Sequence, residues 1–450
     1  MTLQARSLKL TNFRCFREAT LDLHPRLTVI VADNGMGKTA LLDAIAVGMA
    51  EYVDPLLGVR TSRGLLPSDV RTAKNGGGPA QLSMTAEVDG QNASWSLTRK
   101  SATSPMRRGA KQLAAVRDVA ARHNETVRKA DSTLPLVVFY QSSRFAHSSY
   151  FGQKFGTTKT SLSGRLLGFA DYLTPLSEAA RFNEWYAVRW RAVAKRASPG
   201  IGPGQDPLAQ LSAVRTAVAQ VLEPTGWSVI DWDDERGCVV VEHATRGRLP
   251  LSWLSSGIRS MIALVADLAY RCACLNPHLG QDAATKTPGL TLIDEVDLHL
   301  HPSWQQRVVE LLQAAFGSMQ CVLTTHSPQV LSTVYSDSVR VVKHHEEGSE
   351  VTRPTLQTRG IESADILAKV MSVYSVPAVP ESQWLSDYTA MVQSGRHEST
   401  EGRALWAKLV DHFGATHPAL DDIAVIRRLQ EFKEVHGLVN GSEGGSNAQA

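Results

Sequence analysis

The sequence has 450 residues, of which 43% are hydrophobic, 20% charged and 6% aromatic, and its formal net charge is +3. A chain of this length forms one large domain with insertions or two domains, and its composition excludes a disordered or fibrous protein. So small a net charge excludes binding to nucleic acid through overall charge, and any such contact has to come from a local basic patch.

Cysteine usage and the N-terminus indicate the cellular compartment. The five cysteines are scattered along the chain and odd in number, which favours buried thiols over disulfides and therefore a reducing cytoplasm. The first residues lack a basic leader with an apolar core, and no uninterrupted apolar run is long enough to cross a bilayer. We expect a cytoplasmic protein without a membrane segment.

The N-terminal part of the chain predicts a sheet followed by a helix. Within residues 7–32, short β-like runs separated by turn-prone breaks indicate β-strands, and residues 37–50 have the apolar spacing of a helix. Asp89 and Gly90 lie between two further alternating runs and predict a hairpin. Residues 101–131 are basic and poor in large apolar residues, so we expect an exposed helical insertion there.

The middle of the chain alternates between helical and strand-like segments. The run "LPLVVFY" at residues 134–140 predicts a buried strand, and residues 160–225 predict a second helical insertion. A small sheet segment is expected at residues 227–242. Two very apolar strands follow at residues 289–293 and 321–325, each ending at polar or charged residues.

These patterns divide the chain into three parts. Residues 1–359, which end in a predicted hairpin, form the main α/β domain. Residues 360–437 are amphipathic and mixed in charge, and we expect a helical region there that binds a partner. Residues 438–450, which end in "NGSEGGSNAQA", are rich in glycine and polar residues and predict a disordered tail.

The stretch "ADNGMGKT", residues 32–39, has the composition of a phosphate-binding loop between a β-branched strand and a helix. Such a loop turns backbone N–H groups toward phosphates, while a lysine reaches the outer phosphates and a hydroxyl binds Mg²⁺. Alanine occupies position 32, where the usual pattern has its first glycine, and it fits there as long as φ stays negative. We predict that nucleotide is bound by Asn34, Gly35, Gly37, Lys38 and Thr39.

Two adjacent acids follow the apolar strand in "LTLIDE". Nucleotide hydrolysis needs one carboxylate to hold Mg²⁺ and another to orient or deprotonate the attacking water. Burying two acids is costly unless a metal ion or a strong partner compensates. We predict that Asp294 binds Mg²⁺ together with Thr39, and that Glu295 is catalytic.

Two further patterns fall at the ends of regular elements. Ser255, Ser256 and Gly257 lie at the start of a periodic helix, where serine hydroxyls and the helix N-terminus can bind an anion. "LTTHSP" places His326 after a buried strand, where a ring nitrogen can sense a γ-phosphate. Taken singly, the four patterns also fit a glycine turn, a surface acid pair, a helix cap and a satisfied polar histidine.

The four motifs in this order resemble the ATP-binding-cassette type of P-loop ATPase, in the branch that includes SMC and RecF. The resemblance implies that "ADNGMGKT" is the Walker A loop, "LTLIDE" the Walker B strand, "LSSG" the signature motif and His326 the switch histidine. It also implies a D-loop with Asp297 and a glutamine-loop residue at Gln141. The fold it implies is an α/β ATPase head with a mixed sheet, helical insertions and a helical C-terminal region. Because no heptad series separates the loop from the signature, no long coiled coil is expected.

ATPases of this type dimerise head to tail around two ATP molecules. The resemblance therefore implies a homodimer or higher homo-oligomer with ATP and Mg²⁺ as ligands. Ser255 and Gly257 of one subunit would meet the γ-phosphate held by Lys38 of the other. Glu295 and His326 would be the catalytic residues of an ATPase that is slow and regulatory.

A narrower resemblance covers most of the chain. "IDEVDLHLHPSWQ", "LTTHSPQVLS" and "RGIESADILAKVMSV" are similar to the bacterial virulence-associated ATP-binding proteins, which include PtuA of Septu and the ATPases of certain retron anti-phage systems. This implies a subunit that regulates a partner nuclease of the HNH type in a defence complex. The alternative is a RecF-like DNA-repair ATPase that binds DNA directly. The two differ in what they expect of the basic residues in the first insertion, which either follow DNA phosphates or form a solvated face: Arg107, Arg108, Lys111, Arg117, Arg122, Arg128 and Lys129.

Overall fold

The computed structural model describes residues 1–58, 64–72, 78–127, 131–142, 162, 164–173, 178–195, 206–345, 348–373 and 377–435. The chain divides into two compact units, Met1–Ser372 (unit 1) and Val373–Ala450 (unit 2). Unit 1 extends past the boundary expected at residue 359, because helix α10 (Ser363–Lys369) packs against helix α9 (Pro328–Leu331).

A six-stranded mixed sheet carries the phosphate loop at one edge. Its strand order is β14-β13-β3-β12-β11-β7, and only β14 runs antiparallel to its neighbour. All residues of β3, β7, β11 and β12 are buried, which explains why these runs are apolar without alternation. The predicted buried strands are thereby confirmed. The strands are β3 (Leu27–Val31), β7 (Leu136–Tyr140), β11 (Gly289–Ile293), β12 (Met319–Thr325), β13 (Val339–His345) and β14 (Gly348–Thr352).

Unit 1 also contains an antiparallel sheet of five strands, β2-β1-β4-β5-β6, and a smaller sheet, β10-β9-β8. The predicted hairpin joins β4 to β5, and its turn residues Asp89 and Gly90 have positive φ values of 49° and 79°. The strands are β1 (Leu3–Phe13), β2 (Phe16–Asp22), β4 (Ala80–Val88), β5 (Gln91–Arg99), β6 (Met106–Arg108), β8 (Trp227–Asp233), β9 (Cys238–His243) and β10 (Gly247–Pro250).

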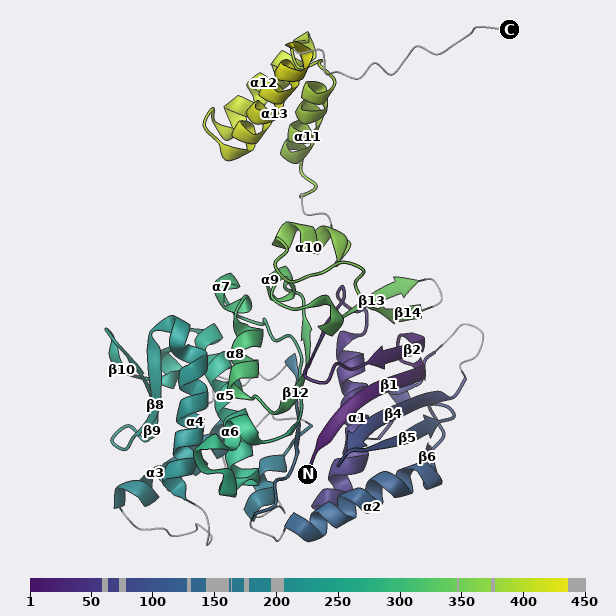
Figure 1. The fold of residues 1–450 in the computed structure, drawn as a ribbon, viewed down its shortest axis with the longest axis vertical. Helices are drawn as coiled ribbons and strands as arrows, with labels where there is room; N and C mark the ends of the chain where they lie inside the picture. The colour runs from purple at the N-terminus through teal and green to yellow at the C-terminus, as the bar shows by residue number, and fades with distance from the viewer. Residues whose placement is uncertain are drawn as a thin grey trace. The chain divides into compact units, whose positions relative to one another are not determined.

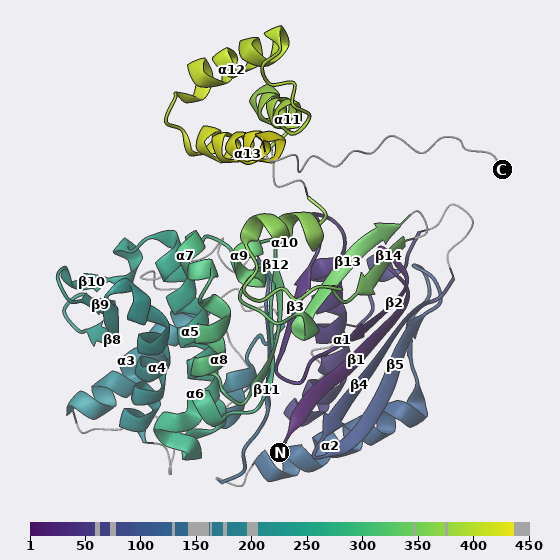
Figure 2. The ribbon, with the colours of Figure 1, turned by 45° about the horizontal axis from the view of Figure 1, so that its top comes forward.

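Helices lie on both sides of the six-stranded sheet (Figure 1, Figure 2). Helix α1 (Lys38–Leu57) lies between it and the five-stranded sheet and contacts β4, β7, β11 and β12, whereas α5 (Ser256–Leu275) contacts β7 from the other side. Helices on the α5 side are α3 (Glu178–Lys195), α4 (Pro207–Leu222), α6 (Ala283–Lys286), α7 (Pro302–Gln305) and α8 (Val308–Ala315).

Helix lengths and cysteine states agree with the fold class predicted from the sequence. The longest described helices, α1 and α5, have 20 residues each, so the described part of the chain contains no long coiled coil. None of the described helices combines the length and the apolar character needed to cross a membrane. The cysteines are free, and Cys272, Cys274 and Cys321 are buried. The predicted α/β fold with a mixed sheet is confirmed.

The first insertion is docked onto the core rather than freely exposed. Its helix α2 (Ala110–Val127) contacts α1 and β5. Glu51 on α1 is buried and accepts 2.7 Å bonds from Arg108 Nε and Arg117 Nη2. Two of the basic residues that could follow DNA phosphates are therefore engaged within the chain. Arg128 and Lys129 lie outside the described residues.

Unit 2 contains a bundle of three helices, α11 (Pro380–Gln393), α12 (Thr400–Phe413) and α13 (Pro418–Val435). The bundle has its own core, separate from that of unit 1, and it falls within the region predicted to bind a partner. The predicted tail at residues 438–450 lies outside the described residues. The core residues are Tyr388, Val392, Leu409, Leu420 and Ile423.

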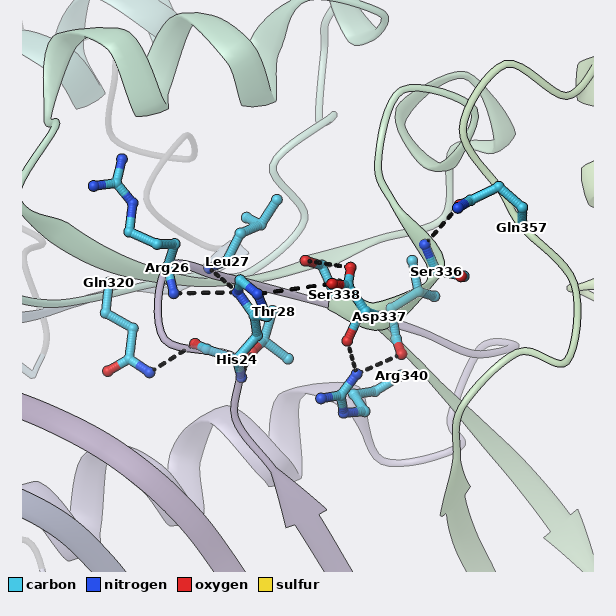
Figure 3. A network of polar contacts seen from close by, with 11 residues as sticks. His24, Arg26, Leu27, Thr28, Gln320, Ser336, Asp337, Ser338, Arg340 and Gln357 are labelled. Atoms are coloured by element: carbon cyan, nitrogen blue, oxygen red, sulfur yellow. Dashed lines mark hydrogen bonds and ion pairs between the residues drawn. The ribbon is translucent and has the colours of Figure 1, made fainter.

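A polar network ties together the amino ends of β3 and β13, at the sheet edge opposite the phosphate loop (Figure 3). His24 Nδ1 accepts the backbone N–H of Arg26 at 3.2 Å, and the His24 carbonyl accepts Gln320 Nε2 at 3.0 Å. Arg340 Nη1 donates to the carbonyl of Asp337 at 2.6 Å. These bonds hold the turn from which β3 delivers the loop. The network borders an open cleft of about 670 Å³, whose described lining contains none of the residues predicted to bind nucleotide.

Candidate nucleotide-binding site

The carboxyl ends of four parallel strands bring the predicted motifs to one edge of the sheet. β3 leads into the phosphate loop, β11 into Asp294 and Glu295, β12 into His326, and β7 into Gln141. The registers of the strand pairs place these ends side by side. Ligands of open parallel sheets bind at this edge. Residues separated by up to 255 positions in the sequence, such as Thr39 and Asp294, are in contact here.

Gly37 shapes the phosphate loop in two ways. Its φ of 101° is unfavourable for a residue with a side chain, and a Cβ there would lie 2.5 Å from Cys15 Sγ and 2.8 Å from the ring of Phe16. The turn between β1 and β2 therefore packs directly against the loop. Asn34 and Gly35 are exposed at its tip. Ala32 keeps a negative φ, as the replacement of glycine by alanine requires.

The Lys38 side chain folds back over the loop. Its Nζ donates to the carbonyls of Ala32 at 2.8 Å and Asp33 at 3.1 Å, and the residue is buried. Burial lowers the pKa of the Lys38 ammonium, while the carboxylates of Asp294 and Glu295 oppose that shift. The ammonium is thus held by neutral carbonyls, which the oxygens of a phosphate can replace with a stronger, charge-assisted bond.

Asp294 is buried, with 1% of its surface exposed, and hydroxyl groups satisfy both of its oxygens. Thr39 Oγ1 donates to Oδ2 at 2.8 Å, and Thr324 Oγ1 donates to Oδ1 at 2.5 Å. These bonds offset the cost of burying a carboxylate. A hydroxyl and a carboxylate side by side are oxygen donors of the kind that Mg²⁺ prefers, so Thr39 and Asp294 fit this ion.

Thr324 was not predicted from the sequence, yet it contacts both acids. Besides bonding Asp294, its Oγ1 accepts the backbone N–H of Glu295 at 2.8 Å. Glu295 has a φ of 50°, a left-handed value that is uncommon outside glycine and that concentrates at functional sites. The two threonines that end the run "CVLTT", of which Thr324 is the first, were the signal that could have identified it.

His326 lies between two residues that hydrogen-bond to the chain after β11, one to the turn that contains Asp297 and one to helix α7. Thr325 Oγ1 donates to Asp297 Oδ1 at 2.6 Å, and Ser327 Oγ donates to Gln305 Oε1 at 2.8 Å. Burial and the nearby Lys38 ammonium lower the pKa of His326, against the pull of the carboxylates around it. The imidazole is therefore neutral at neutral pH and keeps one acceptor and one donor nitrogen.

The signature residues lie at the N-terminus of α5. Ser255 and Ser256 are exposed, and the Ser255 side chain makes no capping bond to its helix. Gly257 is packed against the segment after Glu295, because a Cβ on it would lie 2.4 Å from the carbonyl oxygen of His299. The segments predicted to be the signature motif and the D-loop are thus in contact within one chain.

We expect Gly257→Ala to lower ATP hydrolysis about tenfold, because the added methyl group displaces the His299 backbone at a cost of roughly 1–3 kcal/mol. Steady-state phosphate release measures this effect. Gly317→Ala is the matched control, since the nearest atom to a Cβ there is at an ordinary 3.5 Å. Equal rates for both variants would show that this contact has no role in hydrolysis.

Gln141 follows β7 directly and belongs to the same edge. Its Nε2 donates to the carbonyl of Leu173 at 3.5 Å, and the preceding carbonyl of Tyr140 accepts the backbone N–H of Asp294 at 2.8 Å. The structure thus brings Gln141 to the predicted site, and its contact with nucleotide stays a prediction. Residues 143–161 lie outside the described part of the chain.

Two family models match the chain, and both describe AAA domains. One covers residues 7–184, and the other, "AAA domain, putative AbiEii toxin, Type IV TA system", covers residues 138–332. Among solved structures, the SMC head bound to the C-winged helix domain of ScpA has a TM-score of 0.47 at 14% identity, over 78% of this chain and 97% of that chain. The SMC head domain from Thermotoga maritima has a TM-score of 0.42 at 16% identity, over 78% of this chain and 100% of that chain.

Curated relatives match a more limited part of the sequence. The retron Ec83 probable ATPase of Escherichia coli is 36% identical over 38% of this chain and 30% of its own length. The retron Vc95 probable ATPase of Vibrio cholerae serotype O1 biovar El Tor is 37% identical over 32% of this chain and 28% of its own length. The Septu protein PtuA of Bacillus thuringiensis is 28% identical over 30% of this chain and 35% of its own length. The chain therefore covers a minor part of the length of these relatives.

The two family models together span residues 7–332, the stretch that contains every predicted site motif. The curated relatives that match the chain include two probable ATPases of retrons and two PtuA proteins of Septu. Residues 7–332 therefore match models of AAA domains, and the chain is similar over about a third of its length to retron probable ATPases and to Septu PtuA.

Proposed function

We propose that two copies of this chain close around ATP, and that ATP binding and slow hydrolysis regulate a partner nuclease of the HNH type in a bacterial anti-phage defence complex. The observation that carries the proposal is Ser255, which is exposed at the start of a 20-residue helix and is not used as a cap. Its hydroxyl and the helix N-terminus are suited to the γ-phosphate bound by Lys38 of another copy. The homology to retron and Septu proteins supports the defence role.

Each side chain at the sheet edge has a distinct task in hydrolysis. Lys38 and the backbone N–H groups of the loop bind the phosphates, and Thr39 with Asp294 would hold Mg²⁺, which neutralises charge on the phosphate oxygens. Glu295 orients the attacking water and accepts its proton. The neutral His326 imidazole hydrogen-bonds the γ-phosphate. Ser255 of the second copy completes the set of ligands.

Helix α13 offers a surface for the partner subunit. It is apolar on two faces: Leu420 and Ile423 are buried in the bundle core, whereas Val425 and Leu429 are 62% and 54% exposed. Phe432, which is 53% exposed, continues the same stripe at helical spacing. A helix with apolar residues on opposite faces is typical of one that packs against something on each. We assign the outer stripe to the nuclease subunit.

We expect Leu429→Glu to abolish copurification of the partner while leaving ATP hydrolysis unchanged, because a charge in the centre of an apolar contact costs several times RT. The measurement is affinity purification of the full chain with its genomic neighbours, followed by determination of the mass of the complex. Leu208→Glu on α4 is the matched control, since Leu208 is also 54% exposed. A partner retained by Leu429→Glu, or lost equally in the control, would refute the assignment.

Direct DNA binding is the alternative function. Some of the basic residues that it would use form ion pairs within the chain. Arg108 and Arg117 bind the buried Glu51, which leaves Arg107 and Arg122 as exposed cations of the described part of this insertion. A DNA-binding titration at several salt concentrations, with and without ATP, separates the two functions. A RecF-like ATPase would show affinity that falls steeply with salt.

A further inference from the structure

Tyr140 joins the nucleotide edge to the signature helix through buried hydrogen bonds. It is the last residue of β7 and is 3% exposed. Its carbonyl accepts the backbone N–H of Asp294 at 2.8 Å, and its hydroxyl donates to Asp267 Oδ2 on α5 at 2.6 Å. One residue therefore contacts the predicted Mg²⁺ ligand through its backbone and α5 through its side chain.

Asp267 is fixed to α5 and to its surroundings. Arg271, one turn later, donates from Nε to Asp267 Oδ2 at 2.7 Å, and both side chains are buried. Arg271 Nη1 also donates to the carbonyls of Gly168 at 3.0 Å and Ala170 at 2.8 Å. Hydrogen bonds to charged groups are strong in such a low-dielectric environment. The acceptor of the Tyr140 hydroxyl cannot shift unless α5 shifts with it.

Because Asp267 lies on α5, its hydrogen bond to the Tyr140 hydroxyl connects strand β7 to that helix. The same helix begins with the signature residues Ser256 and Gly257, and a packed helix moves as a rigid element rather than bending locally. A change in the position of Asp294 when nucleotide and Mg²⁺ bind would therefore reach Ser255 through β7 and α5.

We propose that Tyr140 is a positioning residue, which transmits the state of the Asp294 edge to α5 and so sets how the helix presents Ser255 to the second copy. It does not touch the reacting atoms. The proposal rests on the dimer of the proposed function for its effect on hydrolysis, whereas the movement of α5 within one chain does not depend on that dimer.

The test is Tyr140→Phe in the full chain, which removes one hydroxyl. Tyr52→Phe is the matched control, because Tyr52 is equally buried and its hydroxyl contacts His123 on α2 at 2.8 Å instead. Tyr140→Phe should keep ATP affinity and KM within about twofold and lower kcat about tenfold, the effect of one hydrogen bond to a charged group. The ATP-induced change in hydrogen exchange across residues 255–260 should be lost in Tyr140→Phe and kept in Tyr52→Phe.

Two results would overturn this assignment. If Tyr140→Phe keeps the parental kcat and the parental exchange response, the hydrogen bond between Tyr140 and Asp267 does not transmit the state of the Asp294 edge to α5. If it loses ATP binding together with hydrolysis, the hydroxyl supports the pocket itself rather than α5. Failure of the proposed dimer is detected separately, as a Glu295→Gln chain that stays monomeric with ATP, and the exchange measurement still decides the role of Tyr140 in that case.

Discussion

Lys38→Ala is expected to lower ATP affinity at least about 100-fold, because the variant loses a charge-assisted bond to the outer phosphates that no neighbouring side chain replaces. The described structure places Lys38 Nζ on the carbonyls of Ala32 and Asp33, directly inside the loop. Titration with a fluorescent ATP analogue in the presence of Mg²⁺ measures the affinity. ATP hydrolysis should be lost with it.

The stability of Lys38→Ala distinguishes a lost ligand contact from a lost fold. Among the described residues, the ammonium donates hydrogen bonds only to neutral carbonyls of its own loop, so its removal should change the free energy of unfolding by about 1 kcal/mol or less. Lys286→Ala is the control, since Lys286 is an exposed lysine paired with Asp282. ATP affinity that is equal in Lys38→Ala and the parent would refute the assignment of residues 32–39 as the nucleotide loop.

The second large effect is expected for Glu295→Gln, on the rate of ATP hydrolysis. We expect hydrolysis to fall by about 10²–10⁴-fold while ATP affinity is kept, because the amide retains the shape of the side chain and cannot accept the proton of the attacking water. The closed dimer should then accumulate. Light scattering coupled to gel filtration with Mg²⁺ and ATP should report a dimer for Glu295→Gln and a lower dimer fraction for the parent chain.

A second substitution tests whether that dimer uses the signature motif. Adding Ser255→Arg to Glu295→Gln places a bulky side chain at the exposed start of α5, and the dimer should disappear while each chain still binds ATP. Glu310→Gln, a change in an exposed residue of α8, serves as the control for the loss of a carboxylate.

Hydrolysis at the parental rate in Glu295→Gln would mean that another group activates the water.

Local patterns were sufficient to identify the elements that carry the site. Four β-branched and apolar runs without alternation correspond to β3, β7, β11 and β12. These strands are buried on both faces, so neither face requires polar residues that contact solvent. The turn at Asp89 and Gly90 and the glycines of the loop were readable because their positive φ values restrict the residue type. The basic composition of the first insertion predicted an exposed helix. In the structure, Arg108 and Arg117 instead bond to Glu51 on helix α1.

The sequence by itself determined which strands are buried, where the phosphate loop lies, and the order of its acids, serines and histidine, because all of these depend on neighbours close along the chain. Only the tertiary structure decided the partners of these residues. Thr324 bonds Asp294 across 30 positions, Tyr140 bonds Asp267 across 127, and Gly257 meets the backbone of His299. Such contacts depend on strand register and on how a helix docks against a sheet, and a one-dimensional pattern of residue types specifies neither.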